Sequence, residues 1–494
     1  MAPSCSCLDR YCRFRFFCSL SVVAIVLATA FASGCGGGSS GTTLRGNTNV
    51  VVLASSTAND QLVQFPVALK NVTLTSQSGN MVTLFSTPVS TEFIHLNGNV
   101  EPMATVSIPQ DTYTSAAAAY DGTAPVCLGL QSPSTAFFID GAINGPGTPS
   151  VTVNLPAPIK VTGTAMGLVL NLQVSESAPF SGGCVQGFSL PIAVSPVFDL
   201  TPMVIAAQPT NSVNGKALGL EGAIASIAET GSGFTVTSLY GYFNGNPPTW
   251  QVSTNGSTVF QGISGVSGLS TGMPVDIDVA LQADGSLMAT RVAVYNTDAA
   301  NLSLSSGQVI LANPPQSSVW GLTAQTEGGL SELYDVFGYE NATSQISGQF
   351  TNLQNLPFVA TFNAANTVAG ENVLVTSNAV SVDGLPPLPL PLATMALMPQ
   401  TINGTVSAIS TSGDFTTYTV TLAPYDPFAE LAGSPGQPAL TSPNTVVVYA
   451  DSNAQMLSSS SVSVGGVFRF YGLVFNNNGT LSMDCAQVND GVAE

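Results

Sequence analysis

The stretch VDIDVALQADGSLMATRVAV, residues 275–294, decides the fold. Its first part, Val275–Leu281, alternates apolar residues with polar or small ones, which is the period of a half-buried β-strand. Asp284-Gly285 follows, and this pair is a strong hairpin signal because a type I′ turn needs positive φ at both central positions. The alternation resumes after the turn, so the stretch predicts two strands joined as a β-hairpin.

A similar hairpin recurs near the end of the chain, in NNGTLSMDCAQV at Asn477–Val488. Related segments precede the two hairpins, Leu220–Thr237 in one case and Ile402–Thr421 in the other. Gly272 and Gly465 stand before the penultimate strand of each. Such self-similarity predicts a repeated unit of β-strands that ends in a hairpin.

A degenerate middle copy is expected from Trp320 to about Val382, with Gly370–Val375 as a matching strand and without the Asp-Gly turn. The proline-rich run Leu385–Pro391 follows it. Proline lacks a backbone N–H, so this run is predicted to be a stiff extended linker rather than a central strand or a helix.

The repeats resemble a family of small β-domains of unknown function that occur in exported bacterial proteins. The family outline is G-x-V-x-x-I, F-T-V, G-x-x-V-x-V and D-G-x-L-x-A-x-x-V, and the first and last units match it. The N-terminal part resembles a second uncharacterised family, typical of bacterial lipoproteins, through Phe65–Leu74, Met81–Phe85, Glu92–Leu96 and Val106–Thr114. This second resemblance implies a β-sandwich in a lipid-anchored envelope protein, and no known activity.

The N-terminus carries an export signal. Three arginines precede the apolar run Phe16–Phe31, and small residues follow, as in a secretory signal peptide. Ala32-Ser33-Gly34-Cys35 resembles a lipobox, which implies lipid attachment at Cys35. Each buried acyl CH₂ contributes about 0.8 kcal/mol, so two or three chains hold a protein firmly on a membrane. The alternative is an ordinary signal with cleavage nearby, which leaves Cys35 free or paired.

The residues after Cys35 bear on localisation. They form a Gly/Ser-rich segment, and such segments are flexible tethers. Gly36, rather than Asp, follows the cysteine, and this favours the bacterial outer membrane, with the domains facing either the periplasm or the surface.

These observations predict an all-β chain with an N-terminal β-sandwich followed by two or three small β-barrel or sandwich-like repeat units. The predicted organisation is a signal peptide over 1–34, a lipid-anchored tether over 35–46, the sandwich over 47–207, repeat units over 215–298, 316–384 and 400–490, and the proline-rich linker over 385–399.

Composition excludes several classes of partner. The formal net charge is −19, and only six of the nine basic residues lie after the signal peptide, so a nucleic-acid partner is excluded. One histidine and the absence of a Cys-x-x-Cys pair argue against a metal site, and no cofactor is expected. Cys127 and Cys184 could form a disulfide in an oxidising envelope, or they could be buried thiols like Cys485.

Few residues suggest chemistry. His95, the sole histidine, is interpreted as a structural or surface residue in a strand-like stretch. Asp276 and Asp278 share one face of a strand, which fits a solvated face or a protected edge better than glycoside hydrolysis. In LYGYFNGNPPTW, residues 239–250, the aromatic side chains are candidate ligand contacts or, alternatively, hairpin and core residues. These aromatic residues are Tyr240, Tyr242 and Trp250.

The expected function is that of a lipid-anchored envelope protein with a binding, adhesive or structural role and no catalytic residues. The expected partners are the membrane, through the anchor, and a polysaccharide or another envelope protein. The alternatives are an exported carbohydrate-active hydrolase that uses carboxylates, and a passive surface spacer.

Overall fold

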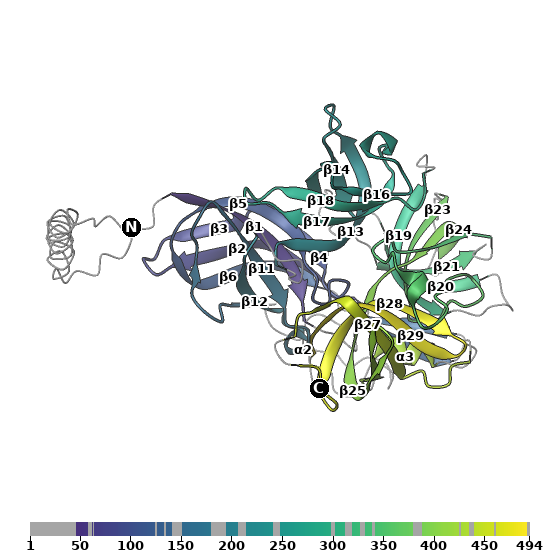
Figure 1. The fold of residues 1–494 in the computed structure, drawn as a ribbon. Helices are drawn as coiled ribbons and strands as arrows, with labels where there is room; N and C mark the ends of the chain where they lie inside the picture. Colours follow the sequence, from purple (N-terminus) through teal and green to yellow (C-terminus); the bar gives the residue numbers. More distant parts are fainter. Residues whose placement is uncertain are drawn as a thin grey trace, which may run out of the picture. The chain divides into compact units, whose positions relative to one another are not determined.

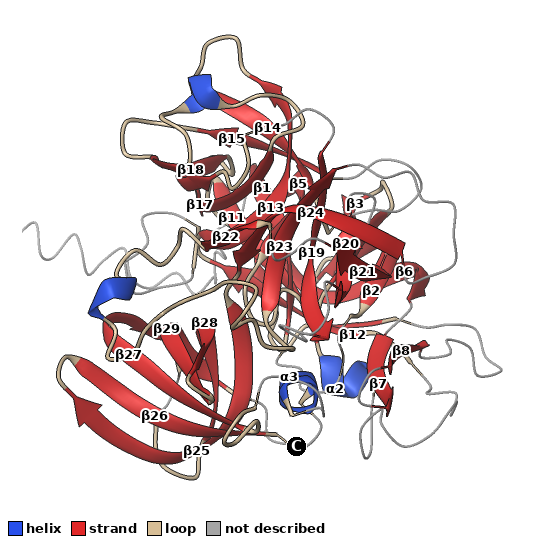
Figure 2. Cartoon of the chain, turned by 90° about the vertical axis from the view of Figure 1, so that its right-hand side faces the viewer, coloured by secondary structure: helices blue, strands red, loops and turns tan. Residues whose placement is uncertain are grey.

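The structure is a computed structural model. It describes residues 46–57, 62, 64–123, 126–132, 135–140, 151–178, 194–205, 214–240, 248–297, 302–311, 319–326, 331–337, 341–378, 388–423, 426–433, 439–458 and 461–491. These residues belong to one compact unit, Gly46–Glu494. Nearly all of its elements are strands, so the prediction of an all-β chain is confirmed (Figure 2). Within the described residues, no helix has the length and apolar character needed to cross a membrane.

The N-terminal part forms a β-sandwich (Figure 1). One sheet has the strand order β5-β1-β11-β12-β9, and the other has the order β10-β6-β2-β3 with β4 paired to β2. β7 and β8 form a separate two-stranded sheet. The elements are β1 (Asn47–Ser56), β2 (Pro66–Ser76), β3 (Met81–Phe85), β4 (Val89–Glu92), β5 (Glu101–Pro109), β6 (Thr112–Thr123), β7 (Val126–Ser132), β8 (Thr135–Asp140), β9 (Thr152–Asn154), β10 (Ile159–Lys160), β11 (Ala165–Leu172), α2 (Val174–Ser177) and β12 (Val197–Met203).

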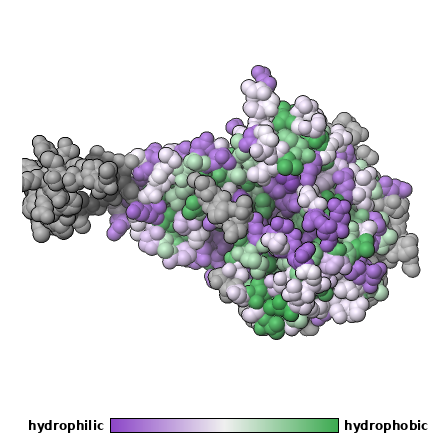
Figure 3. Space-filling model, viewed as in Figure 1, coloured by the Kyte–Doolittle hydropathy of each residue, from purple (hydrophilic) through white to green (hydrophobic). Residues whose placement is uncertain are grey.

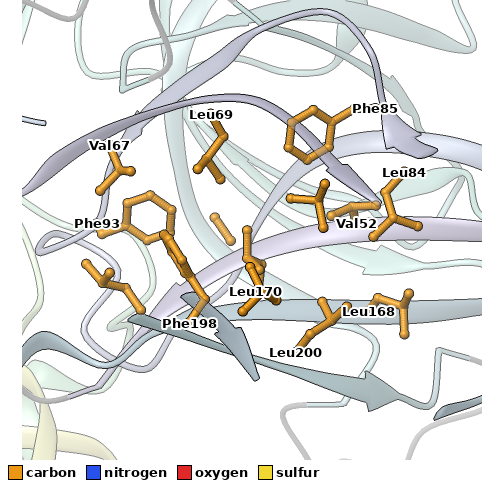
Figure 4. Close-up of a cluster of buried hydrophobic side chains, with 14 of the residues drawn as sticks. Val52, Val67, Leu69, Leu84, Phe85, Phe93, Leu168, Leu170, Phe198 and Leu200 are labelled. Carbon is orange, nitrogen blue, oxygen red and sulfur yellow. The ribbon is translucent and has the colours of Figure 1, made fainter. Parts of the chain in front are cut away.

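The sandwich core lies between the two sheets, where Leu69 and Leu84 from one sheet face Leu168 and Leu200 from the other (Figure 4). β1 is buried on both faces, which explains its unbroken apolar run. Val52 points into the sandwich core, whereas its neighbours Val51 and Leu53 join the core of the following unit.

Three barrel units follow, and they share one strand order. The first closes as β15-β14-β13-β17-β18, the middle one as β21-β20-β19-β23-β24, and the last as β27-β26-β25-β28-β29, with the first and last strand of each series paired. In the first and middle units an additional short strand, β16 or β22, also pairs with the final strand of the unit. In the last unit the C-terminal end of β27 pairs with the final strand at the equivalent place. The first unit comprises β13 (Lys216–Ile227), β14 (Gly233–Ser238), β15 (Thr249–Ser253), β16 (Val259–Gln261), η1 (Val266–Gly268), β17 (Pro274–Leu281) and β18 (Leu287–Ala293).

The middle unit comprises β19 (Leu302–Leu311), β20 (Val319–Thr326), β21 (Ser331–Phe337), β22 (Thr343–Ile346), η2 (Leu353–Asn355), β23 (Asn372–Asn378) and β24 (Leu388–Leu397). The last unit comprises β25 (Gln400–Ser412), β26 (Phe415–Leu422), α3 (Pro427–Ala432), β27 (Thr445–Met456), β28 (Val467–Asn477) and β29 (Thr480–Asp490).

A shared local device marks the three units as copies of one design. In each unit the first strand has a β-bulge, and a residue beside the bulge accepts a hydrogen bond from a glycine that precedes the penultimate strand. All three glycines have a positive φ, between 84° and 102°, which L-residues rarely adopt. The bonded pairs are Gly272 to Ile224 (2.7 Å), Gly370 to Val309 (2.6 Å) and Gly465 to Val406 (2.8 Å).

The middle unit differs from the predicted one. It starts at Leu302 rather than at residue 316. Its first strand contains Gly307-Gln308-Val309, which corresponds to Gly222-Ala223-Ile224 in the first strand of the first unit, and Trp320 lies in its second strand. Its chain between β23 and β24 contains Asp383-Gly384, the sequence counterpart of the Asp-Gly pair that had been expected to be missing.

The predicted proline-rich linker is wrong over Leu388–Leu397, which form β24. Pro389 and Pro391 lie two residues apart, so both lack an N–H on the same side of the strand. β24 pairs with β21 over residues 388–391, but its pairing with β23 starts only at Leu392. The prolines therefore occupy the part of the strand that has a neighbour on one side, where they are tolerated.

Adjacent units share hydrophobic clusters. The core of the first barrel unit includes Val51 and Leu53 of the sandwich, and Leu473 and Phe475 of the last unit pack into the core of the middle unit. On the face drawn in Figure 3, hydrophilic residues are widely spread with smaller hydrophobic patches between them. Much of the apolar surface of each unit is thus covered by its neighbours.

Candidate functional site

Polar and ionisable side chains meet where the sandwich contacts the first and middle barrel units. We call this group the junction cluster. It consists of Glu92, His95 and Glu101 of the sandwich, Glu221 and Tyr240 of the first unit, and Ser306 of the middle unit. All of them except His95 are buried, and the imidazole of His95 keeps only 20% of its exposure.

His95 lies at the centre of the junction cluster. It sits in a turn after β4, not in the strand that its apolar neighbours predicted. Nδ1 lies 3.1 Å from Oε2 of Glu92, and Nε2 lies 3.3 Å from Oε2 of Glu101. The imidazole also stacks on the ring of Tyr240, with centroids 3.6 Å apart and an angle of 6° between the planes.

Glu92 holds this turn in place. Its Oε1 accepts hydrogen bonds from the backbone N–H groups of Phe65 and Ile94, each at 2.7 Å. Its Oε2 accepts from the backbone N–H of His95 at 2.8 Å. Gly98 has φ +96°, and it ends the turn before β5 begins at Glu101. One carboxylate therefore fixes both the backbone of the turn and the histidine side chain.

Tyr240 connects the sandwich to the barrel units. Its hydroxyl donates a 2.8 Å hydrogen bond to Oε2 of Glu221, which also bonds to Ser306. Its backbone oxygen accepts from the N–H of Glu92 at 3.3 Å. Ser238, two residues earlier, donates to Oε1 of Glu101 at 2.8 Å.

The surroundings shift the proton affinities of the cluster. Burial opposes a charge on His95, but hydrogen bonds and charges of Glu101 and Glu92 outweigh it and raise the pKa of the imidazole to about 9. Burial also opposes charge on Glu92, yet the imidazole of His95 and the backbone amides of Phe65 and His95 lower the pKa of this carboxyl. Burial raises the pKa of Glu221 to about 7. His95 is thus a cation at neutral pH, and Glu221 is the group that titrates there.

Two small cavities adjoin the junction cluster. One of about 130 Å³ is lined by Glu92, His95 and Asp426, and one of about 60 Å³ is lined by His95, Glu101 and Glu221. Pockets for drug-sized ligands measure roughly 300–1,000 Å³. These cavities therefore suit water or a small ion rather than a sugar chain. Among the described residues, no group of three or more His, Cys, Asp or Glu is arranged to hold a metal ion.

A second charged group, which we call the arginine cluster, corrects the interpretation of Asp276 and Asp278. These residues were expected on a solvated face or an edge, but Asp276 has no exposure and Asp278 is 8% exposed. Arg291 on the neighbouring strand donates from Nη2 to Asp276 at 2.8 Å and from Nε to Asp278 at 2.7 Å. Tyr295 donates to the second oxygen of Asp276 at 2.9 Å.

The arginine cluster also contacts the other units. Gln349 of the middle unit donates from Nε2 to Oδ1 of Asp278 at 2.7 Å. Tyr471 of the last unit donates to Oε1 of Gln349 at 3.0 Å. The hydroxyl of Tyr295 accepts from the N–H of Gly348 at 3.1 Å. A continuous set of hydrogen bonds thus links all three barrel units.

The predicted aromatic contacts are not brought together as a binding surface. Trp250 is 4% exposed in the core of the first unit, and its Nε1 donates to the backbone oxygen of Pro102 at 2.9 Å. Tyr240 is buried against His95. The prediction that these two side chains contact a ligand is therefore wrong, because neighbouring units cover them. Tyr242 lies outside the described residues.

The remaining predicted site residues are cysteines. Cys35 and Cys184 lie outside the described residues, so the lipid attachment and the Cys127–Cys184 disulfide stay predictions. Cys485 is a buried free thiol, and burial raises its pKa well above the usual range.

Sequence reasoning missed Glu92, Glu101 and Glu221 as partners of one site. One signal was available for Glu221, because a carboxylate rarely stands inside an otherwise apolar strand unless it is paired.

Residues 221–293 match the family model of a domain of unknown function (DUF5666). The matched residues lie within the first barrel unit, which is therefore similar to this domain. The match begins at Glu221 of the junction cluster and includes Tyr240 and the three charged residues of the arginine cluster. No curated protein matches the chain. The middle and last units share the strand order of the matched first unit, as described above.

Proposed function

We propose that this chain is a lipid-anchored bacterial envelope protein that acts as a rigid scaffold. The observation that carries the proposal is that side chains of the junction cluster contact one another across unit boundaries, through a ring stack and hydrogen bonds. His95 of the sandwich stacks on Tyr240, and Tyr240 bonds to Glu221, which bonds to Ser306 of the middle unit. Such bonds, together with the shared hydrophobic clusters, fix the units against each other.

The same geometry favours a scaffold over a hydrolase that uses carboxylates. Glu92 and Glu101 are both engaged by His95, and Asp276 and Asp278 are both engaged by Arg291. Catalytic carboxylates must reach a substrate, whereas Glu92 and Glu101 line cavities too small for a sugar chain and Asp276 and Asp278 are buried. A passive spacer of independent units would not need buried hydrogen bonds between its units.

Binding of a neutral polysaccharide is the second candidate. One groove of about 510 Å³ has a lining without charged residues, and it includes Thr87, Ser90, Thr105 and Thr249. Thr105→Trp would fill this groove, and Thr230→Trp, on an exposed turn outside its lining, is the control. Glycan arrays that bind the wild type and the control but not the Thr105 variant would support this candidate, and arrays without signal would remove it.

The anchor is tested in cells. The wild type and Cys35→Ser are grown with a labelled fatty acid, and the mature N-terminus is analysed by mass spectrometry. We expect label on the wild type and none on the variant, which should leave the membrane fraction. An unlabelled, soluble wild type would overturn the lipid anchor and leave the scaffold to be judged on its own test.

The scaffold is tested by calorimetry of the mature chain. We expect the wild type to unfold in one cooperative transition, because the units share cores and hydrogen bonds. Tyr471→Phe removes the hydroxyl that reaches Gln349, so it should weaken the coupling between the last two units. Tyr418→Phe, inside the last barrel, is the matched control. Separate transitions for the individual units of the wild type would refute the scaffold.

A further inference from the structure

A polar cavity of about 220 Å³ lies where the sandwich meets the start of the first barrel unit and the last barrel unit. Its lining includes Ser55 and Asn171 of the sandwich, Lys216 of β13 and Arg469 of β28. We call it the basic cavity. We propose that the basic cavity binds a small oxyanion that carries hydroxyl groups, such as a sugar phosphate.

The charge of the lining is unusual for this chain. The chain has a formal net charge of −19, and only six basic residues follow the signal peptide. Two of them, Lys216 and Arg469, line the basic cavity, and none of its described lining residues is acidic. In a strongly acidic protein, a cavity whose charged lining residues are all cations favours an anionic ligand.

Arg469 has an unused donor at this place. Its Nε donates to the backbone oxygen of Asp490 at 2.8 Å, but its buried Nη1 has no hydrogen-bond partner among the described residues. Burial lowers the pKa of this guanidinium, although the charge of Asp490 acts in the opposite direction. An unsatisfied charged donor is costly to bury, and an oxyanion in the cavity would satisfy it.

Gly98 makes room for the guanidinium. A Cβ atom at this position would lie 2.8 Å from Nη1 of Arg469. The φ of +96° also favours glycine. The turn that carries His95 therefore approaches Arg469 closely only because residue 98 has no side chain.

The rest of the lining points to a ligand with hydroxyl groups. Oδ1 of Asn171 is buried without a hydrogen-bond partner, so it can accept from a ligand hydroxyl. The cavity is smaller than pockets for drug-sized ligands, which measure roughly 300–1,000 Å³. Its volume and its mixture of cationic and amide groups fit a single phosphorylated sugar.

Titration calorimetry of the mature chain tests the proposal, with glucose 6-phosphate, inorganic phosphate and glucose as probes. We expect saturable binding of glucose 6-phosphate, weaker binding of phosphate and none of glucose. Binding should weaken as salt is added, because the attraction is electrostatic. Phosphate bound as tightly as glucose 6-phosphate would overturn the role of the hydroxyl groups. Absence of binding of both anions would overturn the proposal entirely.

Variants locate the site. Arg469→Met should lower the affinity about tenfold or more, because it removes a charged donor. Lys216→Gln is a second variant that keeps the test valid if the arginine variant folds poorly. Lys70→Gln is the matched control, because it removes an equal charge from an exposed ion pair with Asp121. Equal affinity of all three variants would place the anion elsewhere and refute the assignment. The outcome is independent of lipid attachment at Cys35.

Discussion

Replacing His95 by Gln removes the one cation of the junction cluster. Glutamine keeps hydrogen-bonding capacity at this place but cannot carry a charge between Glu92 and Glu101. The variant therefore isolates the electrostatic part of the contact. Because the cluster joins the sandwich to the barrel units, the change should act on the stability of the whole folded chain.

The magnitude follows from the proton affinity of the imidazole. A pKa raised from the usual 6.5 to about 9 corresponds to about 3 kcal/mol in favour of the charged form. The imidazole retains 20% exposure, so solvent screening makes this an upper value. Because the folded pKa is above the unfolded one, this stabilisation is fully present below pH 6.5. It is lost as the pH rises through about 9.

Two assays measure the effect. His95 is the sole histidine, so a sample with isotope-labelled histidine gives one imidazole signal, and its NMR titration reports the pKa directly. Urea unfolding of the wild type and His95→Gln, repeated between pH 6 and pH 10, measures the difference in the free energy of unfolding. We expect a difference of up to about 3 kcal/mol near pH 6 and a much smaller one at pH 10.

Glu101→Gln is the matched control, because it removes one of the two carboxylates and leaves the histidine. Its imidazole signal should titrate at a lower pH than that of the wild type. A wild-type pKa near 6.5 would refute the reasoning. So would a destabilisation by His95→Gln that stays constant from pH 6 to pH 10, because steric loss alone would then explain it.

Three further predictions concern residues outside the His95 contact. Burial raises the pKa of Glu221 from 4.5 to about 7, so its ionisation lowers the stability of the fold as the pH rises through that range. The free energy of unfolding of Glu221→Gln, relative to wild type, should therefore be more favourable at pH 8 than at pH 5. Urea unfolding that shows the reverse would contradict this prediction. Arg291→Met leaves two buried carboxylates unpaired and should cost about 3–5 kcal/mol in urea unfolding, whereas a loss below about 1 kcal/mol would show that the carboxylates find other partners. Gly465→Ala adds a Cβ that meets no neighbouring atom, but the φ of +86° disfavours any L-residue, so the variant should lose about 1–2 kcal/mol of unfolding free energy. Gly256→Ala is the control, because its Cβ also lies in open space and its φ is not positive, and it should change stability little in the same assay.

The sequence by itself determined the fold class and the repeat. Alternation in Val275–Leu281 and the Asp284-Gly285 turn are local signals, and the strands β17 and β18 form where these signals predict them. The equivalence of Gly272 and Gly465 could be predicted from the sequence, because the positive φ before the penultimate strand favours glycine in each copy. The same reasoning wrongly predicted a linker at the prolines of β24. Whether a missing N–H matters depends on which side of the strand has a neighbour, and that is a property of the sheet.

The candidate site was decided by tertiary structure alone. Glu92, His95 and Glu101 lie close together in the sequence, but Glu221 and Ser306 reach them only because the sandwich and two barrel units pack together. Asp276 and Asp278 follow the pattern of a solvated strand face, and only the position of Arg291 on the neighbouring strand makes their burial tolerable. Periodicity reports which residues share a face, whereas burial and pairing depend on what covers that face, and the covering elements here come from distant parts of the chain.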